Sequence, residues 1–247
     1  MAPGLLAAYE ALKDRGHQVT ACAPDCQRSA ASQSVTLRRP IKVAPWAMPD
    51  GALGFAVYGT PADCARLGFS VLAKEPVDLV VSGINDDFNL GFDINYSGTV
   101  AAAIEAAAAG YPALAVSVQR TSEYDWKRAT HVLVAVIDSF SSWNLPQGVA
   151  VNLNIPDKLS ASRNEWFWTR PHLRPAEDYF ESEPHPDGSV LYQRLRDQPG
   201  ELPGEADEGA PDSDLAHARL GHITLSPILP HSCHEATLVR LIEASRV

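Results

Sequence analysis

Apolar runs along this chain alternate with segments in which apolar residues recur at helical intervals. Continuous apolar runs are typical of strands that are covered on both faces of a parallel sheet. Three such runs occur, at 77–83, 112–118 and 149–155. Helices are predicted over four segments, from Pro3 to Gly16 and over 62–74, 98–110 and 125–142. The order strand, helix, strand, helix predicts an α/β fold with a parallel sheet and right-handed crossovers.

Shorter β-rich runs precede these elements, at 17–24, 36–43 and 54–59. The second contains Pro40, which cannot donate a ladder hydrogen bond, so this run is predicted to form an edge strand. Thr60 and Pro61 have the chemistry of a helix N-cap and first helical position, which supports a helix start there.

The composition changes beyond Pro156. Residues 157–219 are rich in Pro, Glu, Asp and Gly, and their aromatic pieces at 166–169 and 189–195 are predicted to form an arm or hairpin. A strand at 221–229 and an amphipathic helix at 234–244 close the chain. We therefore expect one domain over 1–247, with a core made of 1–156 and 220–247. The stretch 157–219 is interpreted as an excursion from that domain.

The loop between the strand at 77–82 and the helix at 98–110 is unusually polar. In parallel α/β sheets, ligands bind beyond the carboxyl ends of strands, where loops lead into helices. Ser97, Gly98 and Thr99 place two hydroxyls and unpaired backbone N–H groups at a helix start, which favours an anion such as phosphate. Asn85 and Asn89 supply carboxamide oxygens of the kind that bind Mg²⁺ or Mn²⁺. The alternative is that these residues only cap the helix and its preceding turn.

Two further loops are expected at the same edge of the sheet. The loop at 23–32 offers Ser29 as a metal oxygen and Arg28 as a phosphate or carboxylate partner. The junction at 58–64 is the third. Arg28 and Asp25 taken alone are more often surface turn residues than ligands.

Composition narrows the classes of function. The formal net charge of −10 disfavours a nucleic-acid platform but is compatible with a small phosphorylated ligand held by local donors. The four cysteines have no metal-binding spacing and are interpreted as reduced, buried thiols. No signal peptide and no apolar run long enough for a membrane span is found, which predicts a soluble, cytoplasmic protein.

Six blocks of this sequence, in order, resemble the SurE family of stationary-phase survival proteins. They are APDCQRSAAS, YGTPADC, VVSGIN with NLG and YSGTVAAAIEA, GYPALAVSV, VNLNIP and DSDLAHARLGHITLSPI. The resemblance covers almost the whole chain. It implies a metal-dependent phosphatase acting on nucleoside 5′- and 3′-monophosphates, with some members trimming polyphosphate. It also implies a Rossmann-like, doubly wound sheet, a C-terminal arm exchanged between subunits, and a homodimer or homotetramer.

The resemblance assigns roles to individual residues. Ser29 and Asn85 match the family's non-carboxylate metal ligands, and the implied ion is a divalent cation such as Mg²⁺ or Mn²⁺. Asn89, Ser97, Gly98 and Thr99 match the residues that line its phosphate pocket.

One family feature is absent. Members usually begin with a hydrophobic strand ending in Asn-Asp-Asp-Gly, followed shortly by Ala-Pro-Gly. Here Ala2, Pro3 and Gly4 occupy the place of that Ala-Pro-Gly, so the first central strand and the carboxylate pair are missing. We expect weak cation binding and two unpaired strand edges around a gap. Either the start codon lies further upstream, the favoured explanation because the rest of the site persists, or the chain is an inactive paralogue.

Asp86 and Asp87 are the weak candidates for a replacement carboxylate, since they follow Asn85 directly. The favoured interpretation is a solvated acidic loop. The leading functional hypothesis is a phosphomonoesterase, and the alternative is a non-catalytic nucleotide- or phosphate-binding paralogue. A third hypothesis is a dimerising interaction module built on the aromatic arm.

Overall fold

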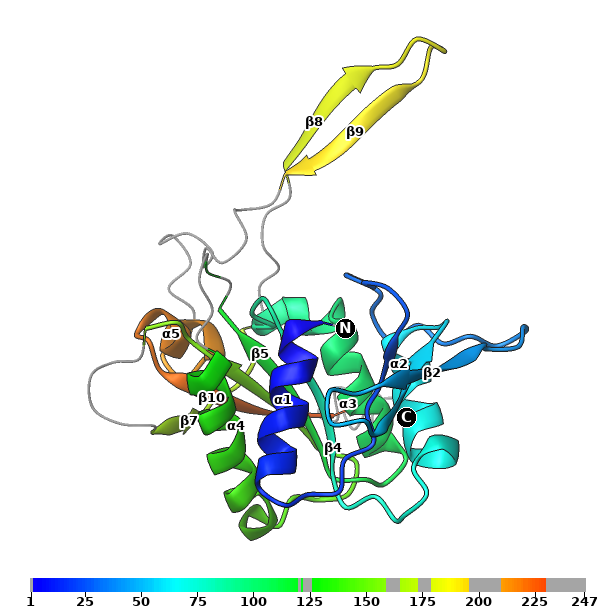
Figure 1. Cartoon of the computed structure of the whole chain (residues 1–247). Coiled ribbons are helices and arrows are strands. Elements are labelled where there is room, and N and C mark those ends of the chain that lie inside the picture. The colour runs from blue at the N-terminus through cyan, green and yellow to red at the C-terminus, as the bar shows by residue number, and fades with distance from the viewer. Residues whose placement is uncertain are drawn as a thin grey trace, which may run out of the picture.

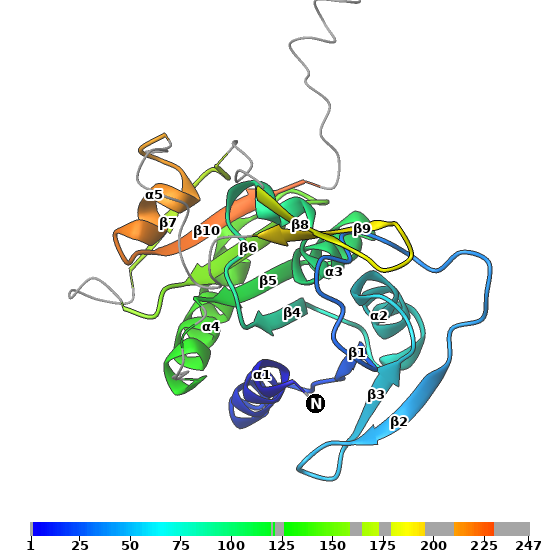
Figure 2. The same cartoon turned by 90° about the horizontal axis from the view of Figure 1, so that it is seen from above.

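Five strands form the main sheet of the computed structural model (Figure 1), and Figure 2 shows their order, β4-β5-β6-β10-β7. The structure describes residues 2–119, 121, 126–158, 165–172, 179–195 and 210–229. The strands are β4 (Val80–Asn85), β5 (Ala113–Val118), β6 (Ala150–Ile155), β7 (Trp166–Trp168) and β10 (Ile223–Ile228). All neighbouring pairs are parallel except β6 with β10, which confirms the predicted α/β class with a mainly parallel sheet.

Helices cover both faces of this sheet (Figure 2). They are α1 (Pro3–Asp14) and α4 (Trp126–Phe140) on one face and α3 (Gly98–Ala108) on the other. Side chains alternate along β5, so Leu114 and Val116 pack in the cluster that includes α4, while Ala113 and Ala115 pack against α3. Every residue of β5 and β6 is buried, as expected for central strands.

A second sheet holds β1, β3 and β2 in the order β1-β3-β2. Its strands are β1 (Cys22–Pro24), β2 (Val43–Ala47) and β3 (Leu53–Val57). The helix α2 (Pro61–Leu67) follows and continues into the π-helical turn η1 (Gly68–Leu72). Within the described chain, no strand pairing joins β1 to β4, so the two sheets present open edges. Figure 2 shows these edges, with α1 beside the gap between them.

Three strand predictions need correction. The strand expected at 36–43 is wrong, because β2 runs from Val43 to Ala47, although it does lie at an edge. The run at 77–83 was expected to be covered on both faces, but β4 is mostly half-buried since one of its edges is unpaired. The aromatic run at 166–169 is not in the arm, because β7 pairs in parallel with β10 in the main sheet.

A two-stranded hairpin projects from the body (Figure 1). It consists of β8 (Tyr179–Pro184) and β9 (Val190–Leu195), paired antiparallel. Phe180 and Tyr192 on it are 60% and 70% exposed. The short helix α5 (Asp214–Arg219) was not predicted and packs near β10. The predicted helix at 234–244 lies outside the described residues.

Candidate functional site

The three loops expected at one edge of the sheet do meet there. A Cβ atom built on Gly98 would lie 2.7 Å from Cγ of Pro61 and 3.6 Å from the carbonyl oxygen of Arg28. The backbone N–H of Ser32 donates to the carbonyl oxygen of Tyr96 at 3.0 Å. Glycine at 98 therefore allows the starts of α2 and α3 to approach closely, beside the 23–32 loop.

A cavity of about 1920 Å³ opens where these loops converge and continues between β1 and β4. Its lining includes every site residue predicted from the sequence. These are Ser29, Asn85, Asp86, Asp87, Asn89, Ser97, Gly98 and Thr99. The structure thus gathers into one space residues that are separated by up to seventy positions in the chain.

Ser97 is the N-cap of α3, and its Oγ accepts a hydrogen bond from the backbone N–H of Val100 at 3.1 Å. This is the capping role that the alternative interpretation predicts. A serine hydroxyl also carries a proton to donate, so a cap can bind an anion at the same time. The first-turn N–H groups, including those of Gly98 and Thr99, have no helical acceptor and carry the positive end of the helix dipole. Ser97 can therefore cap α3 while the start of the helix binds an anion.

The two predicted metal ligands supply neutral oxygens. Asn85 donates its Nδ2 to the carbonyl oxygen of Asp87 at 2.6 Å, which leaves the carboxamide oxygen for another partner. Ser29 is exposed, and its Oγ accepts a hydrogen bond from Gln27 at 3.0 Å. Arg28 forms an ion pair with Asp25 at 3.0 Å, so its charge is partly balanced within its own loop.

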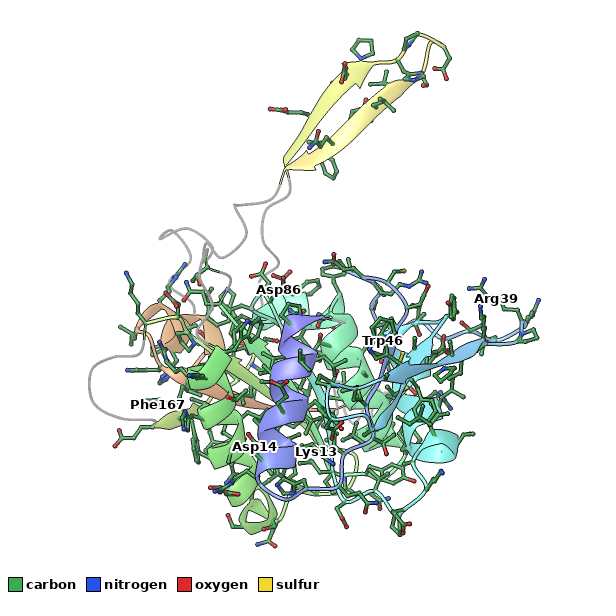
Figure 3. All side chains as sticks on the ribbon, in the orientation of Figure 1. Lys13, Asp14, Arg39, Trp46, Asp86 and Phe167 are labelled. Atoms are coloured by element: carbon green, nitrogen blue, oxygen red, sulfur yellow. The ribbon has the colours of Figure 1, made fainter. Side chains whose placement is uncertain are left out.

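The two carboxylates that follow Asn85 have different surroundings. Asp86 is exposed, at the end of the body from which the hairpin projects (Figure 3). Asp87 accepts the backbone N–H of Phe88 through Oδ1 at 3.0 Å. Among the described residues, no group of three or more His, Cys, Asp or Glu side chains could hold a metal ion. The described oxygen atoms are of the kind that binds a hard divalent cation, but they carry too little negative charge to hold one tightly.

Asn89 differs from the other predicted site residues because it is buried and fixed on several sides. Its Nδ2 donates to Ser117 Oγ at 2.6 Å, and its backbone N–H donates to Asn154 Oδ1 at 2.9 Å. Its carbonyl oxygen accepts from Nδ2 of Asn152 at 2.7 Å. The buried polar residues of β5 and β6 thus anchor the loop. In the sequence, these residues are visible as polar positions inside the apolar runs at 112–118 and 149–155.

A second anchor, Asp214, was quoted in a motif but given no role by the sequence. Its carboxylate is fully buried and accepts N–H groups from Gly91 at 2.7 Å, His172 at 2.9 Å and Leu215 at 2.8 Å. Burial raises the pKa of Asp214, and these hydrogen bonds oppose that rise. Gly91 adopts φ +52°, and a Cβ atom built on it would lie 2.7 Å from the carbonyl oxygen of His172, so glycine lets the site loop pass close to the segment before the hairpin.

Asp63 holds the third loop, the junction at 58–64, in place. It forms a capping box with Thr60, and its Oδ1 and Oδ2 also accept the N–H and hydroxyl of Thr36 at 2.9 and 2.7 Å. Burial raises the pKa of Asp63, but the hydrogen bonds together outweigh it and hold the pKa below its usual value. The start of α2, which contacts Gly98, is thereby held in place.

The cysteines differ from their predicted burial. Cys64 is buried and Cys22 is half-buried, while Cys26 is exposed, which corrects the expectation that the thiols are uniformly buried. Cys233 lies outside the described residues. No described helix has the length and apolar character needed to cross a membrane.

Comparison with known proteins gives a consistent result. The family model described as Survival protein SurE matches residues 1–178. A Kosmotoga olearia protein named 5′-nucleotidase SurE is 34% identical over 247 residues, covering 98% of this chain and 93% of that protein. A Synechococcus protein of the same name is 37% identical over 234 residues, with 90% and 82% coverage. The crystal structure of the SurE protein from Aquifex aeolicus matches with a TM-score of 0.78 at 27% identity, covering 99% of this chain and 95% of that one.

Proposed function

Because this chain belongs to the SurE family, we propose that it is a phosphatase that hydrolyses nucleoside monophosphates to nucleoside and phosphate. Its relatives are named 5′-nucleotidases, and they match it over most of their length. The α/β fold and the cavity at the strand ends are compatible with such a substrate.

The observation that carries this proposal is the start of α3 in the cavity wall. The N–H groups of Gly98 and Thr99, with the hydroxyls of Ser97 and Thr99, offer donors to the cavity at the positive end of a helix. A phosphoryl group gains negative charge as it is transferred, and donors fixed in advance stabilise that charge. We propose that Asn89 mainly positions the pocket, because its hydrogen bonds to β5 and β6 hold the loop that leads to Ser97.

Ser29 and Asn85 are proposed as ligands of a divalent cation, with Mg²⁺ or Mn²⁺ as the suitable ions. A bound ion of this type would polarise a phosphoryl oxygen and acidify a water molecule. Neutral ligands alone leave such an ion mostly hydrated, so the described donors form an incomplete cation site. We therefore expect this chain to hold the cation weakly and to turn over slowly.

The incomplete cation site also favours a second candidate function. A protein that keeps the phosphate-binding helix start but lacks the anionic ligands can bind nucleotides without hydrolysing them. This non-catalytic role is supported by the lack of a three-residue acidic or His/Cys group among the described residues.

One pair of measurements tests these proposals. Residues 1–247 are incubated with a nucleoside monophosphate and saturating Mn²⁺ or Mg²⁺, and phosphate release is measured beside calorimetric binding. Phosphate release at a rate proportional to the protein concentration supports the phosphatase. Binding without release selects the non-catalytic role, and the absence of both would overturn the proposed phosphate pocket.

Within the stretch 157–219, the hairpin of β8 and β9 is proposed as the contact between copies in a homodimer or homotetramer, because β7 and α5 belong to the body of the protein. Phe180, Leu191 and Tyr192 on the hairpin are more than half exposed, and apolar side chains at this density are usually covered by a partner.

A further inference from the structure

Cys22 and Cys64 lie side by side although they are 42 positions apart. The thiol of Cys22, on β1, donates to the carbonyl oxygen of Cys64, on α2, at 3.3 Å. The two thiols influence each other's pKa, as expected for close neighbours. Gly68 lies one helical turn after Cys64, and a Cβ atom built on it would be 3.8 Å from that of Cys22. The face of α2 and η1 that carries Cys64 and Gly68 therefore lies directly over Cys22.

We propose that Cys22 and Cys64 are a modification site, at which a hydroperoxide converts the two thiols into a reversible intramolecular disulfide. The sulfur of Cys22 already lies against the backbone of Cys64, and β1 already contacts α2, so bond formation requires no new contact between these elements. Cys22 lines the large cavity and is half-buried, which gives a small oxidant a route to its sulfur.

The surroundings assign a different role to each thiol. The neighbouring Cys64 thiol lowers the pKa of Cys22, and burial opposes this effect. The neighbouring Cys22 thiol, together with burial, raises the pKa of Cys64. Cys22 therefore reaches the thiolate state first and attacks the oxidant, while the 4% exposed Cys64 reacts second.

The reaction balances in two steps. The Cys22 thiolate attacks one peroxide oxygen, the O–O bond breaks, and the leaving hydroxide takes a proton to become water, which leaves a sulfenic acid on Cys22. The sulfur of Cys64 then displaces the hydroxyl group of that sulfenic acid, which leaves as a second water after proton transfer from the thiol. Two thiols are oxidised to one disulfide while one hydrogen peroxide is reduced to two waters.

The new bond would tie together two elements that lead into the candidate site. β1 runs into the loop that carries Ser29, and Pro61 at the start of α2 touches Gly98. The cross-link also closes a chain loop of about forty residues, which restricts the unfolded state. We expect the oxidised protein to melt at a higher temperature than the reduced protein, and the difference to vanish with dithiothreitol.

The test uses the full chain with Cys26→Ser and Cys233→Ser, which leaves only the proposed pair of its four cysteines. After treatment with hydrogen peroxide and denaturation, the thiol count should fall from two per chain to none. Peptide mass spectrometry should then join the peptides of Cys22 and Cys64 at a mass lower by two hydrogens. Both changes should reverse with dithiothreitol, and the unoxidised variant should melt as the parent does.

Single variants in this background separate the roles. With Cys64→Ser the reaction should stop at a sulfenic acid on Cys22, which dimedone traps. With Cys22→Ser the remaining thiol should react at least tenfold more slowly. The proposal would be overturned if two titratable thiols per chain survived peroxide, or if cross-links formed only between separate chains. It would also be overturned if Cys64 reacted as fast in the Cys22→Ser variant as Cys22 does in the Cys64→Ser variant.

Discussion

Replacing Ser97 separates helix capping from phosphate binding, because two substitutions remove the same hydroxyl at different cost to the helix. Ser97 accepts the Val100 N–H as the N-cap of α3. Loss of an N-cap to alanine costs about 1 kcal/mol of stability, whereas glycine at this position costs only a few tenths. We therefore expect Ser97→Ala to lower the free energy of unfolding by about 1 kcal/mol and Ser97→Gly to lower it much less.

Both variants should lose phosphate affinity to a similar extent. A hydrogen bond to a charged group contributes about 1.5–3 kcal/mol, which corresponds to roughly ten- to hundredfold weaker binding of phosphate or nucleotide. Thr99→Val removes the second hydroxyl and should weaken binding by a comparable factor while leaving the cap intact. Binding is measured by titration calorimetry and stability by urea unfolding, in the same buffer.

Ser213 offers a matched control, since it caps α5 in the same way by accepting the Ala216 N–H at 3.2 Å. Ser213→Ala should reduce stability by about the N-cap amount and leave phosphate affinity unchanged. If Ser97→Ala and Ser97→Gly differ in stability but both bind phosphate like the parent, the hydroxyl only caps the helix and the reasoning is refuted.

Three other predictions concern stability, assembly and activity. Asp63→Asn should lower stability by about 1–3 kcal/mol at pH 7, because it disrupts a buried acceptor of several hydrogen bonds. The folded pKa of Asp63 is below its unfolded value, so this contribution is present above about pH 4 and lost as pH falls through the folded pKa. The free energy of unfolding, measured as a function of acid pH, should therefore change less in the variant than in the parent. Light scattering should give a mass above that of a monomer at micromolar concentrations, and a monomer throughout would rule out the proposed contact through the hairpin. A chain extended at its N-terminus by a strand ending in Asn-Asp-Asp-Gly should hydrolyse nucleoside monophosphates far faster than residues 1–247 when both are assayed with saturating Mn²⁺ or Mg²⁺. Equal rates would contradict that claim, and loss of the short chain's activity in Asp86→Asn or Asp87→Asn would identify a relocated ligand.

Local chemistry was enough to predict the elements that hold the site. Three helices begin at signals that the sequence shows: α1 at Pro3, α2 after Thr60 and α3 after Ser97. The apolar runs of β5 and β6 were also predicted, because burial on both faces leaves a pattern that needs no knowledge of neighbours.

The elements that were missed depend on contacts made across the fold. β7 has only three residues, and its aromatic side chains fit an arm as well as a sheet edge until β10 is placed beside it. The anchoring roles of Asn89 and Asp214 depend on distant partners such as Asn154, 65 positions from Asn89, and Gly91, 123 positions from Asp214, so no local pattern reveals them. Burial likewise cannot be predicted for β4, because its apolar sequence does not indicate which edge is paired.

The open edges of β1 and β4 have a consequence for how the protein unfolds. With no hydrogen-bonded ladder between the sheets in the described chain, they are joined by helix packing and by loop contacts such as the hydrogen bond from Ser32 to Tyr96. In α1, Ala8 packs in the main core while Tyr9 packs with Ala21 and Met48 beside the smaller sheet. Such a boundary divides a domain into units of unequal stability. Amide hydrogens of β1, β2 and β3 should therefore exchange with solvent through openings that leave β5 and β6 protected.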